Sequence, residues 1–351
     1  MVRITADFQQ ERVLHPAAIS LLSEFFTNGW ADPNKLNNTS RQAAILLQQV
    51  RQTFATALNA RPDEIEFLGE VDLGFQLGIT GLLKAESKLY YSKIDRQKIF
   101  AVATTEQNLG RSTTCLPVDG NGEIADFTCG PQDVICWQVA NGESGNLQKV
   151  IKKQALIFAD CTASGVDHLP EFEYQTALFD SASWQGPVGL GVLVIKSAEK
   201  WRNPLPHNDL ARTPGTFSIP LALASAVALE NYLKEIDIRS QLKQQIIEFI
   251  KSEIADVDIA SSAEGLAKFV SFSIKGIEAD RALLALEELG FAVDSGSACK
   301  SADMQPSHVL AAMGRPIAGN LRLTIHKDIS EKMVKEFCQA LKITVAKLRR
   351  N

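Results

Sequence analysis

Residues 294–310 read DSGSACKSADMQPSHVL, and this stretch decides the fold expected for the C-terminal third of the chain. Within it, Cys299 stands in a loop of small residues with Lys300 beside it. The apolar run 291–293 leads in as an expected strand, and Pro306 stands at an early position of an expected helix. A cysteine in such a loop, next to a cation, is typical of a reactive thiol. A lone cysteine is more often an inert small hydrophobe, so the residues alone leave both roles open.

Helical and extended segments alternate through the first two thirds of the chain. The expected strands lie at 64–68, 99–104, 134–139, 155–159, 178–179 and 190–195. This alternation predicts a largely parallel sheet with helices on both faces, and therefore an α/β fold. A long helical region follows, and the remainder alternates short strands and helices, which is typical of a small α+β domain.

Composition and charge exclude several classes of protein. The 351 residues carry a formal net charge of −5 and are 45% apolar, so we expect no nucleic-acid partner and no membrane partner. No apolar run approaches 18 residues, and the first residues carry no apolar signal core. The six cysteines form no CxxC pair, which favours a reducing compartment without a disulfide framework or metal site. We therefore expect a cytoplasmic protein.

The motif SGSAC…PSHVL, preceded by DRALLALEELGFAV, closely resembles the C-terminal domain of cysteine desulfurases. These belong to the class V aminotransferase group of pyridoxal-phosphate (PLP) enzymes of fold type I. In them the cysteine corresponding to Cys299 takes sulfur from the substrate and becomes a persulfide. The resemblance implies a homodimer whose large domain, 15–239, holds a mostly parallel seven-stranded sheet. It also implies a small α+β domain, made of 1–14 and 240–351, that carries the Cys299 loop.

The resemblance also indicates that two parts of the PLP machinery have changed. The family pattern S-x-H-K-x-x-G-P-K-G aligns with 181–190, where the Gly-Pro pair fixes the register and Ser183 replaces the lysine that forms the Schiff base. A serine hydroxyl cannot form an imine. At the phosphate-binding loop, Glu70 and Asp72 replace small donor residues. A carboxylate about 4 Å from a negative charge of the phosphate would cost about 4 kcal/mol at an effective dielectric near 20. The residues alone also allow these two acids simply to cap a helix.

The other positions are assigned by the same resemblance. Gln107 would replace the stacking histidine, and Asn141 lies beside the position of the asparagine that contacts the cofactor. Asp160 would face the pyridine nitrogen, although an aspartate at a strand end is also a common helix cap. Thr216 would reach the neighbouring subunit's phosphate, and Arg322 would grip a substrate carboxylate.

Three hypotheses follow for the function. The first is a catalytically degenerate cysteine desulfurase-like protein, acting as a binding, scaffold or regulatory homologue. The second is a sulfur carrier that uses a Cys299 persulfide without PLP and receives sulfur from a sulfur-transfer partner. The third is an active enzyme of the group with PLP bound non-covalently. In all three we expect no covalently bound PLP.

Overall fold

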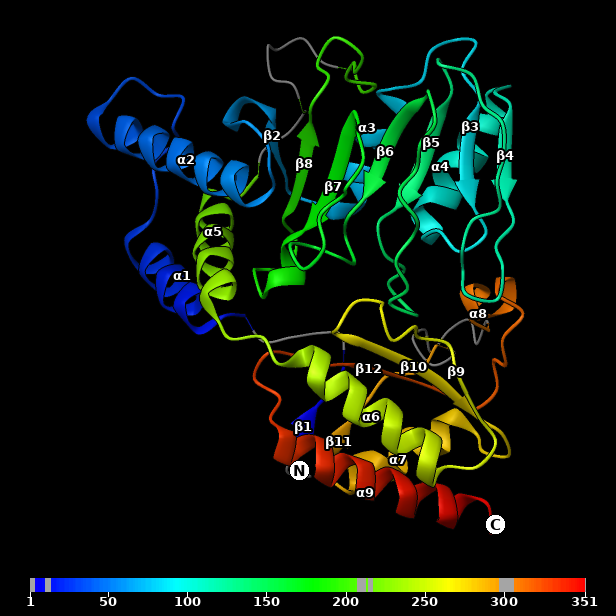
Figure 1. The fold of residues 1–351 in the computed structure, drawn as a ribbon. Coiled ribbons are helices and arrows are strands. Elements are labelled where there is room, and N and C mark those ends of the chain that lie inside the picture. Colours follow the sequence, from blue (N-terminus) through cyan, green and yellow to red (C-terminus); the bar gives the residue numbers. More distant parts are fainter. Residues whose placement is uncertain (1–3, 10–13, 207–212, 214–216, 297–305, 351) are drawn as a thin grey trace.

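The computed structural model describes residues 4–9, 14–206, 213, 217–296 and 306–350. A seven-stranded sheet forms the centre of the larger part, with the strand order β2-β8-β7-β6-β5-β3-β4 (Figure 1). Its strands are β2 (Ile65–Leu68), β3 (Leu89–Ser92), β4 (Thr113–Leu116), β5 (Val134–Gln138), β6 (Leu156–Asp160), β7 (Thr176–Asp180) and β8 (Gly191–Ile195). The pairs from β4 through β7 are parallel, whereas β8 runs antiparallel to both β7 and β2. The expected α/β fold with a mostly parallel seven-stranded sheet is therefore confirmed.

Helices cover both faces of this sheet, which explains why its central strands are apolar along their whole length. All five residues of β5 are buried, and the first four alternate between two separate hydrophobic clusters. One cluster contains side chains from α1 (Pro16–Asn28), α2 (Asn38–Ala57) and α5 (Ile219–Lys234). The other contains side chains from α3 (Val71–Thr80) and α4 (Gln97–Asn108). The sheet is thus the middle of three layers.

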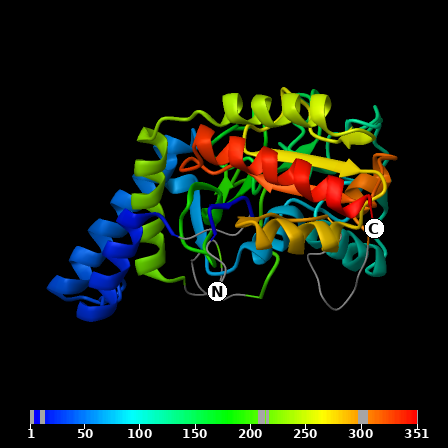
Figure 2. The ribbon, with the colours of Figure 1, turned by 90° about the horizontal axis from the view of Figure 1, so that it is seen from below.

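A second part of the molecule lies against the lower edge of the large sheet in Figure 1. Its three-stranded antiparallel sheet has the order β12-β10-β9, and β1 pairs in parallel with β11. The bounds are β1 (Ala6–Asp7), β9 (Val257–Ile259), β10 (Phe269–Ile274), β11 (Phe291–Ala292) and β12 (Asn320–Thr324). The helices are α6 (Arg239–Glu253), α7 (Ala279–Glu288), α8 (His308–Ala312) and α9 (Glu331–Leu348). Figure 2, seen from below, shows α6, α7 and α9 laid across this sheet.

Alternation along β12 gives the small sheet two different faces. Leu321 and Leu323 belong to the core cluster that also contains residues of α6, α7 and α9. Asn320, Arg322 and Thr324 have the opposite orientation, which faces the large sheet. Each part therefore has its own hydrophobic core, and both polar side chains and two small apolar clusters lie between the two parts. The division into domains at residue 239 stays a prediction. No helix in the described part of the chain is long and apolar enough to cross a membrane.

One expected strand is wrong. Residues 99–104 lie inside α4, and the strand in this region is β3, ten residues earlier. The run Ile99-Phe100-Ala101-Val102-Ala103 is apolar over a length that either a strand or a buried helix can have.

Candidate functional site

A cleft of about 390 Å³ opens where the carboxyl ends of β5 and β6 meet the polar face of β12. We call it the sheet-edge cleft; Asp95, Arg96, Asn141, Gly142, Asp160 and Arg322 are among the residues that line it. Carboxyl ends of parallel strands are where α/β proteins place their ligand sites. Three predicted site residues, Asn141, Asp160 and Arg322, are thus brought to one cavity.

Asp160 is the last residue of β6 and is almost completely buried. Its Oδ1 accepts hydrogen bonds from the backbone N–H of Thr162 at 2.9 Å and from the Thr162 hydroxyl at 2.6 Å. Its Oδ2 lies 3.6 Å from Nε of Arg96. The carboxylate that the resemblance assigns to the pyridine nitrogen therefore faces a cation of its own chain.

Arg96 owes its position to the turn between β3 and α4, where it is the N-cap residue. A side chain there follows the carboxyl end of a strand and points into the cleft. A Cβ added to Gly142 would lie 3.3 Å from Nη2 of Arg96, so a larger residue at 142 would crowd the guanidinium. The glycine found where the family has asparagine therefore leaves room for Arg96.

Asn141 is buried, and its amide is used within the protein. Its Nδ2 donates to the carbonyl of Ile94 at 3.1 Å and to Oε1 of Gln138 at 3.0 Å. Its Oδ1 accepts from the backbone N–H groups of Glu143 and Ser144, both at 2.9 Å. These bonds hold the turn after β5. Contact between this amide and a bound cofactor stays a prediction.

Asp95 adds a buried carboxyl group to the wall of the cleft. It accepts hydrogen bonds from the backbone N–H of Ser92 at 2.7 Å and from Nε2 of Gln138 at 2.9 Å. Burial raises the pKa of Asp95 to about 7. No local pattern indicates this buried group, because an Asp after a short strand is ordinarily an exposed turn residue.

Arg322 reaches the cleft from β12, on the small sheet. Its Nη2 lies 3.4 Å from Oδ2 of Asp294. The same two residues pair through their backbones, with both N–H···O distances between 2.8 and 3.0 Å. The guanidinium is therefore positioned by the segment that leads into the Cys299 loop.

The N-terminus of α3, where the resemblance places the phosphate loop, carries acidic groups. Glu70 is the N-cap residue, and its side chain accepts from the backbone N–H of Asp72 at 3.3 Å. Asp72 forms an ion pair with Lys98, with an N···O distance of 2.7 Å. These carboxylates occupy the positive, N-terminal end of the helix dipole, where a phosphate would otherwise bind. The interpretation of both acids as helix caps is consistent with this arrangement.

Two predicted positions do not belong to this cleft. Gln107 is exposed near the C-terminal end of α4 and is not among the described residues that line the cleft. The structure does not bring Gln107 to the cleft, and its assignment to the histidine position, which rests on the resemblance, stays a prediction. Arg96, at the start of the same helix, has the place beside Asp160. Ser183 lies in the short helix η2 (Ser181–Trp184), where its hydroxyl donates to the carbonyl of Asp180 at 2.7 Å, and it opens on a different cavity.

Cys299 and Thr216 lie outside the described residues, so their predicted roles stay predictions. Of the other cysteines, Cys136, Cys161 and Cys338 are buried. Within the described part of the chain, no group of three His, Cys, Asp or Glu side chains could hold a metal ion.

Comparison with known proteins agrees with this architecture. A family model described as Aminotransferase class-V matches residues 13–337. The chain belongs to this family. A cysteine desulfurase IscS from Clostridium botulinum is 26% identical over 361 aligned positions, covering 94% of this chain and 91% of that protein. The family's cysteine desulfurases are PLP-dependent.

Solved structures show the same fold. A NifS-like protein superposes with a TM-score of 0.86 at 19% identity and covers 99% of this chain and 100% of its own. A NifS-like protein from Rickettsia africae gives a TM-score of 0.81 at 17% identity, with coverage of 98% and 99%. At these identities the likeness shows the fold alone.

Three features of the chain, two of them at the sheet-edge cleft, differ from the PLP site that the resemblance implies. Arg96 stands beside Asp160, where the resemblance expects the pyridine ring. Two carboxylates stand at the helix N-terminus that would receive the phosphate. No amine is available at position 183, which carries a serine. Each of these three points opposes a different part of the cofactor.

Proposed function

We propose that this chain acts without lysine-bound PLP, as a binding or regulatory relative of the cysteine desulfurases. The observation that supports it most is the Arg96–Asp160 pair, because it gives the buried carboxylate a cation from the chain itself. The cleft keeps a volume of about 390 Å³, and Arg322 lies on its wall. A guanidinium in that place suits a ligand that carries a carboxylate.

Three further parts of the proposal rest on the resemblance and the composition alone. They are a homodimer, a cytoplasmic location and a role beside sulfur or iron–sulfur metabolism. A sulfur-transfer protein would be the corresponding partner.

The proposal is tested by incubating the protein with PLP, reducing it with borohydride and mapping the modified peptides. We expect only scattered labelling of exposed lysines, at the level given by a heat-unfolded sample of the same chain. One phosphopyridoxyl group per chain at a single lysine, together with sulfide release from cysteine, would contradict the proposal. The lysines to inspect first are Lys98, beside the cleft, and Lys268 and Lys327, beside Ser183.

The same preparation separates the two alternatives. PLP that stays with the protein through dialysis at one molecule per chain, without labelling, would favour non-covalent PLP chemistry. A PLP-free sulfur carrier requires a reactive Cys299, which alkylation followed by mass spectrometry measures directly. Cys338 is a suitable slow reference, because burial raises its pKa to about 12. Alkylation of Cys299 no faster than that of Cys338 would exclude the carrier.

A further inference from the structure

A second, smaller cavity of about 70 Å³ lies between the end of β7 and the small sheet. Asp180 and Ser183 line it from the large-sheet side, and Lys268, Lys327 and Thr324 line it from the other. We call it the lysine pocket. Among the described residues, none lines both this pocket and the sheet-edge cleft. The two cavities adjoin, since Thr162 of the lysine pocket donates to Asp160 of the cleft.

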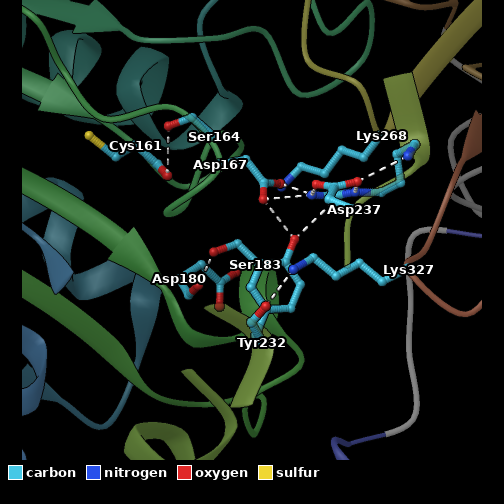
Figure 3. Close-up of polar contacts among 10 residues, drawn as sticks. Cys161, Ser164, Asp167, Asp180, Ser183, Tyr232, Asp237, Lys268 and Lys327 are labelled. Atoms are coloured by element: carbon cyan, nitrogen blue, oxygen red, sulfur yellow. Dashed lines mark hydrogen bonds and ion pairs between the residues drawn. The ribbon is translucent and has the colours of Figure 1, made fainter. Parts of the chain in front are cut away.

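Next to the pocket, one carboxylate is shared by two buried cations (Figure 3). Asp167 accepts from both Nη atoms of Arg239, at 3.1 and 2.8 Å, and its Oδ2 lies 3.2 Å from Nζ of Lys268. It also accepts from the hydroxyl of Tyr232 at 2.8 Å. Asp237 is the second acidic partner of Arg239. Two carboxylates thus make the ion pairs of Arg239 and Lys268, and among the described residues neither of them makes an ion pair with a further cation nearby.

Lys327 is that further cation. Its Nζ lies 3.8 Å from the centre of the Tyr232 ring and donates to the Tyr232 carbonyl. In the described part of the structure no carboxylate oxygen lies within 4 Å of this amine. Burial, followed by repulsion from Arg239, lowers the pKa of Lys327, although attraction by Asp237, Asp167 and Glu235 acts in the opposite direction. An anion placed beside the amine would relieve both effects.

A hydroxyl group without a partner lies in the same wall. Thr324 is 4% exposed, and its Oγ1 is buried without a hydrogen bond. Thr324 shares the polar face of β12 with Arg322, two residues earlier. A buried hydroxyl that makes no hydrogen bond costs free energy, and such groups call for an explanation in a folded protein. A small shift of the wall would let this hydroxyl donate to a bound anion.

We propose that the lysine pocket binds a small anion, a carboxylate or an oxyanion, held between Lys327 and Lys268. The two amines give charge-assisted bonds to it, and the volume limits it to a group of few atoms. Among the described lining residues Asp180 is the only carboxylate, and it opposes such a ligand. Burial raises the pKa of Asp180, which weakens this opposition because the neutral form becomes easier to reach. The proposal goes beyond the function proposed for the sheet-edge cleft and does not depend on it.

The test measures the thermal midpoint and the binding heat of the full chain with sodium acetate, phosphate and sulfate. A sample in sodium chloride at matched ionic strength serves as the reference, because it shows the effect of general charge screening on stability. An anion that binds only the folded chain raises the midpoint with concentration. Acetate binding alone assigns a carboxylate site, and phosphate or sulfate binding assigns an oxyanion site. Midpoints no higher than in chloride for all three anions would overturn the proposal.

Two variants and one control locate the site. Lys327→Gln is expected to weaken binding about tenfold, as the loss of one charge-assisted bond does. Asp180→Asn is expected to strengthen binding by about fivefold, because it removes a like charge. The amide oxygen of the asparagine side chain in this variant can still accept from the backbone N–H of Ala182, so the fold is retained. The Asp180→Asn measurement therefore tests the proposal even if Lys327→Gln fails to fold. Lys332→Gln, on the exposed face of α9, is expected to change nothing. Unchanged binding in Lys327→Gln, or weaker binding in Asp180→Asn, would overturn the proposal.

Discussion

Two groups of charges lie along the same edge of the large sheet, and they differ in how firmly they are held. In the sheet-edge cleft, Arg96 meets Asp160 at a single N···O distance of 3.6 Å, and 38% of the Arg96 side chain is exposed. Beside the lysine pocket, Asp167 makes two bonds to Arg239 and an ion pair with Lys268, and all three are buried or nearly so. The first group can rearrange around a ligand. The second ties together residues from both sheets and acts as part of the core.

The largest expected effect is on the buried group. Replacing Asp167 by Asn leaves Arg239 and Lys268 without their shared carboxylate, so we expect a loss of about 3–5 kcal/mol in unfolding free energy. Burial by itself would raise the pKa of Asp167, but Lys268 and Arg239 reverse this and hold it well below its usual range. Urea unfolding at neutral pH measures the change.

The matched control is Asp237→Asn. Asp237 also pairs with Arg239, but 40% of its side chain is exposed, so its loss is expected to cost about 1 kcal/mol or less. Equal losses in the two variants would show that the buried group is no more important for stability than an exposed pair.

The parts of this group lie far apart in the sequence, which explains why sequence reasoning missed it. Asp167, Tyr232, Arg239, Lys268 and Lys327 come from five separate segments and carry no local pattern. Only the packing of the small sheet against the large one brings them together (Figure 3). Residue pattern and resemblance could not place a cluster that depends on that packing.

Other parts could be predicted, because their signals are local. Asp160 ends an apolar strand and Arg322 alternates with leucines, and each lies in the cleft. The expected strand at 99–104 was wrong because a short apolar run is compatible with either a strand or a helix. Arg96 could have been found from the turn after the tyrosine-rich strand β3, had that strand been recognised. The sheet itself could be predicted from short apolar runs that alternate with helical segments, and this pattern does not depend on side chains at the site.

The second prediction concerns the cleft and its dependence on pH. The folded chain holds a proton on Asp95 up to a pH of about 7, whereas the unfolded chain loses it near 3.8. Stability from this group is therefore present below about pH 4, falls as the pH rises toward 7 and is constant above that. The fall is on the order of 4 kcal/mol. Burial also raises the pKa of Asp180 and of Glu143, so they contribute with the same sign.

Unfolding free energies of the native chain and of Asp95→Asn, measured from pH 4 to pH 8, check this prediction. The variant should lose less stability across the range than the native chain, because it has one fewer group that binds a proton on folding. A slope as steep in the variant as in the native chain would assign the pH dependence to other groups.

The third prediction is a small effect in the cleft. Arg96→Ala removes one long, partly exposed ion pair, so we expect a change within about 1 kcal/mol. Arg281→Ala is the control, since Arg281 makes an exposed ion pair with Glu278 and lies outside the cleft. A loss of several kcal/mol in Arg96→Ala alone would show that the cleft depends on this pair as the core depends on Asp167.

The smallest expected effect is the return of the family's lysine. Ser183→Lys restores an amine, but position 183 lines the lysine pocket, where Lys268 and Lys327 already stand. Beside Asp160, the Arg96 guanidinium still occupies the region expected for a pyridine ring, and Glu70 and Asp72 still oppose a phosphate. We therefore expect no lysine-bound PLP after reduction and no sulfide release from cysteine above that of the native chain. Because each defect opposes a different part of the cofactor, one amine cannot compensate for the others. Measurable sulfide release by this variant would show that the charges in the cleft yield readily to a cofactor, and that the serine alone separates this chain from its PLP-dependent relatives.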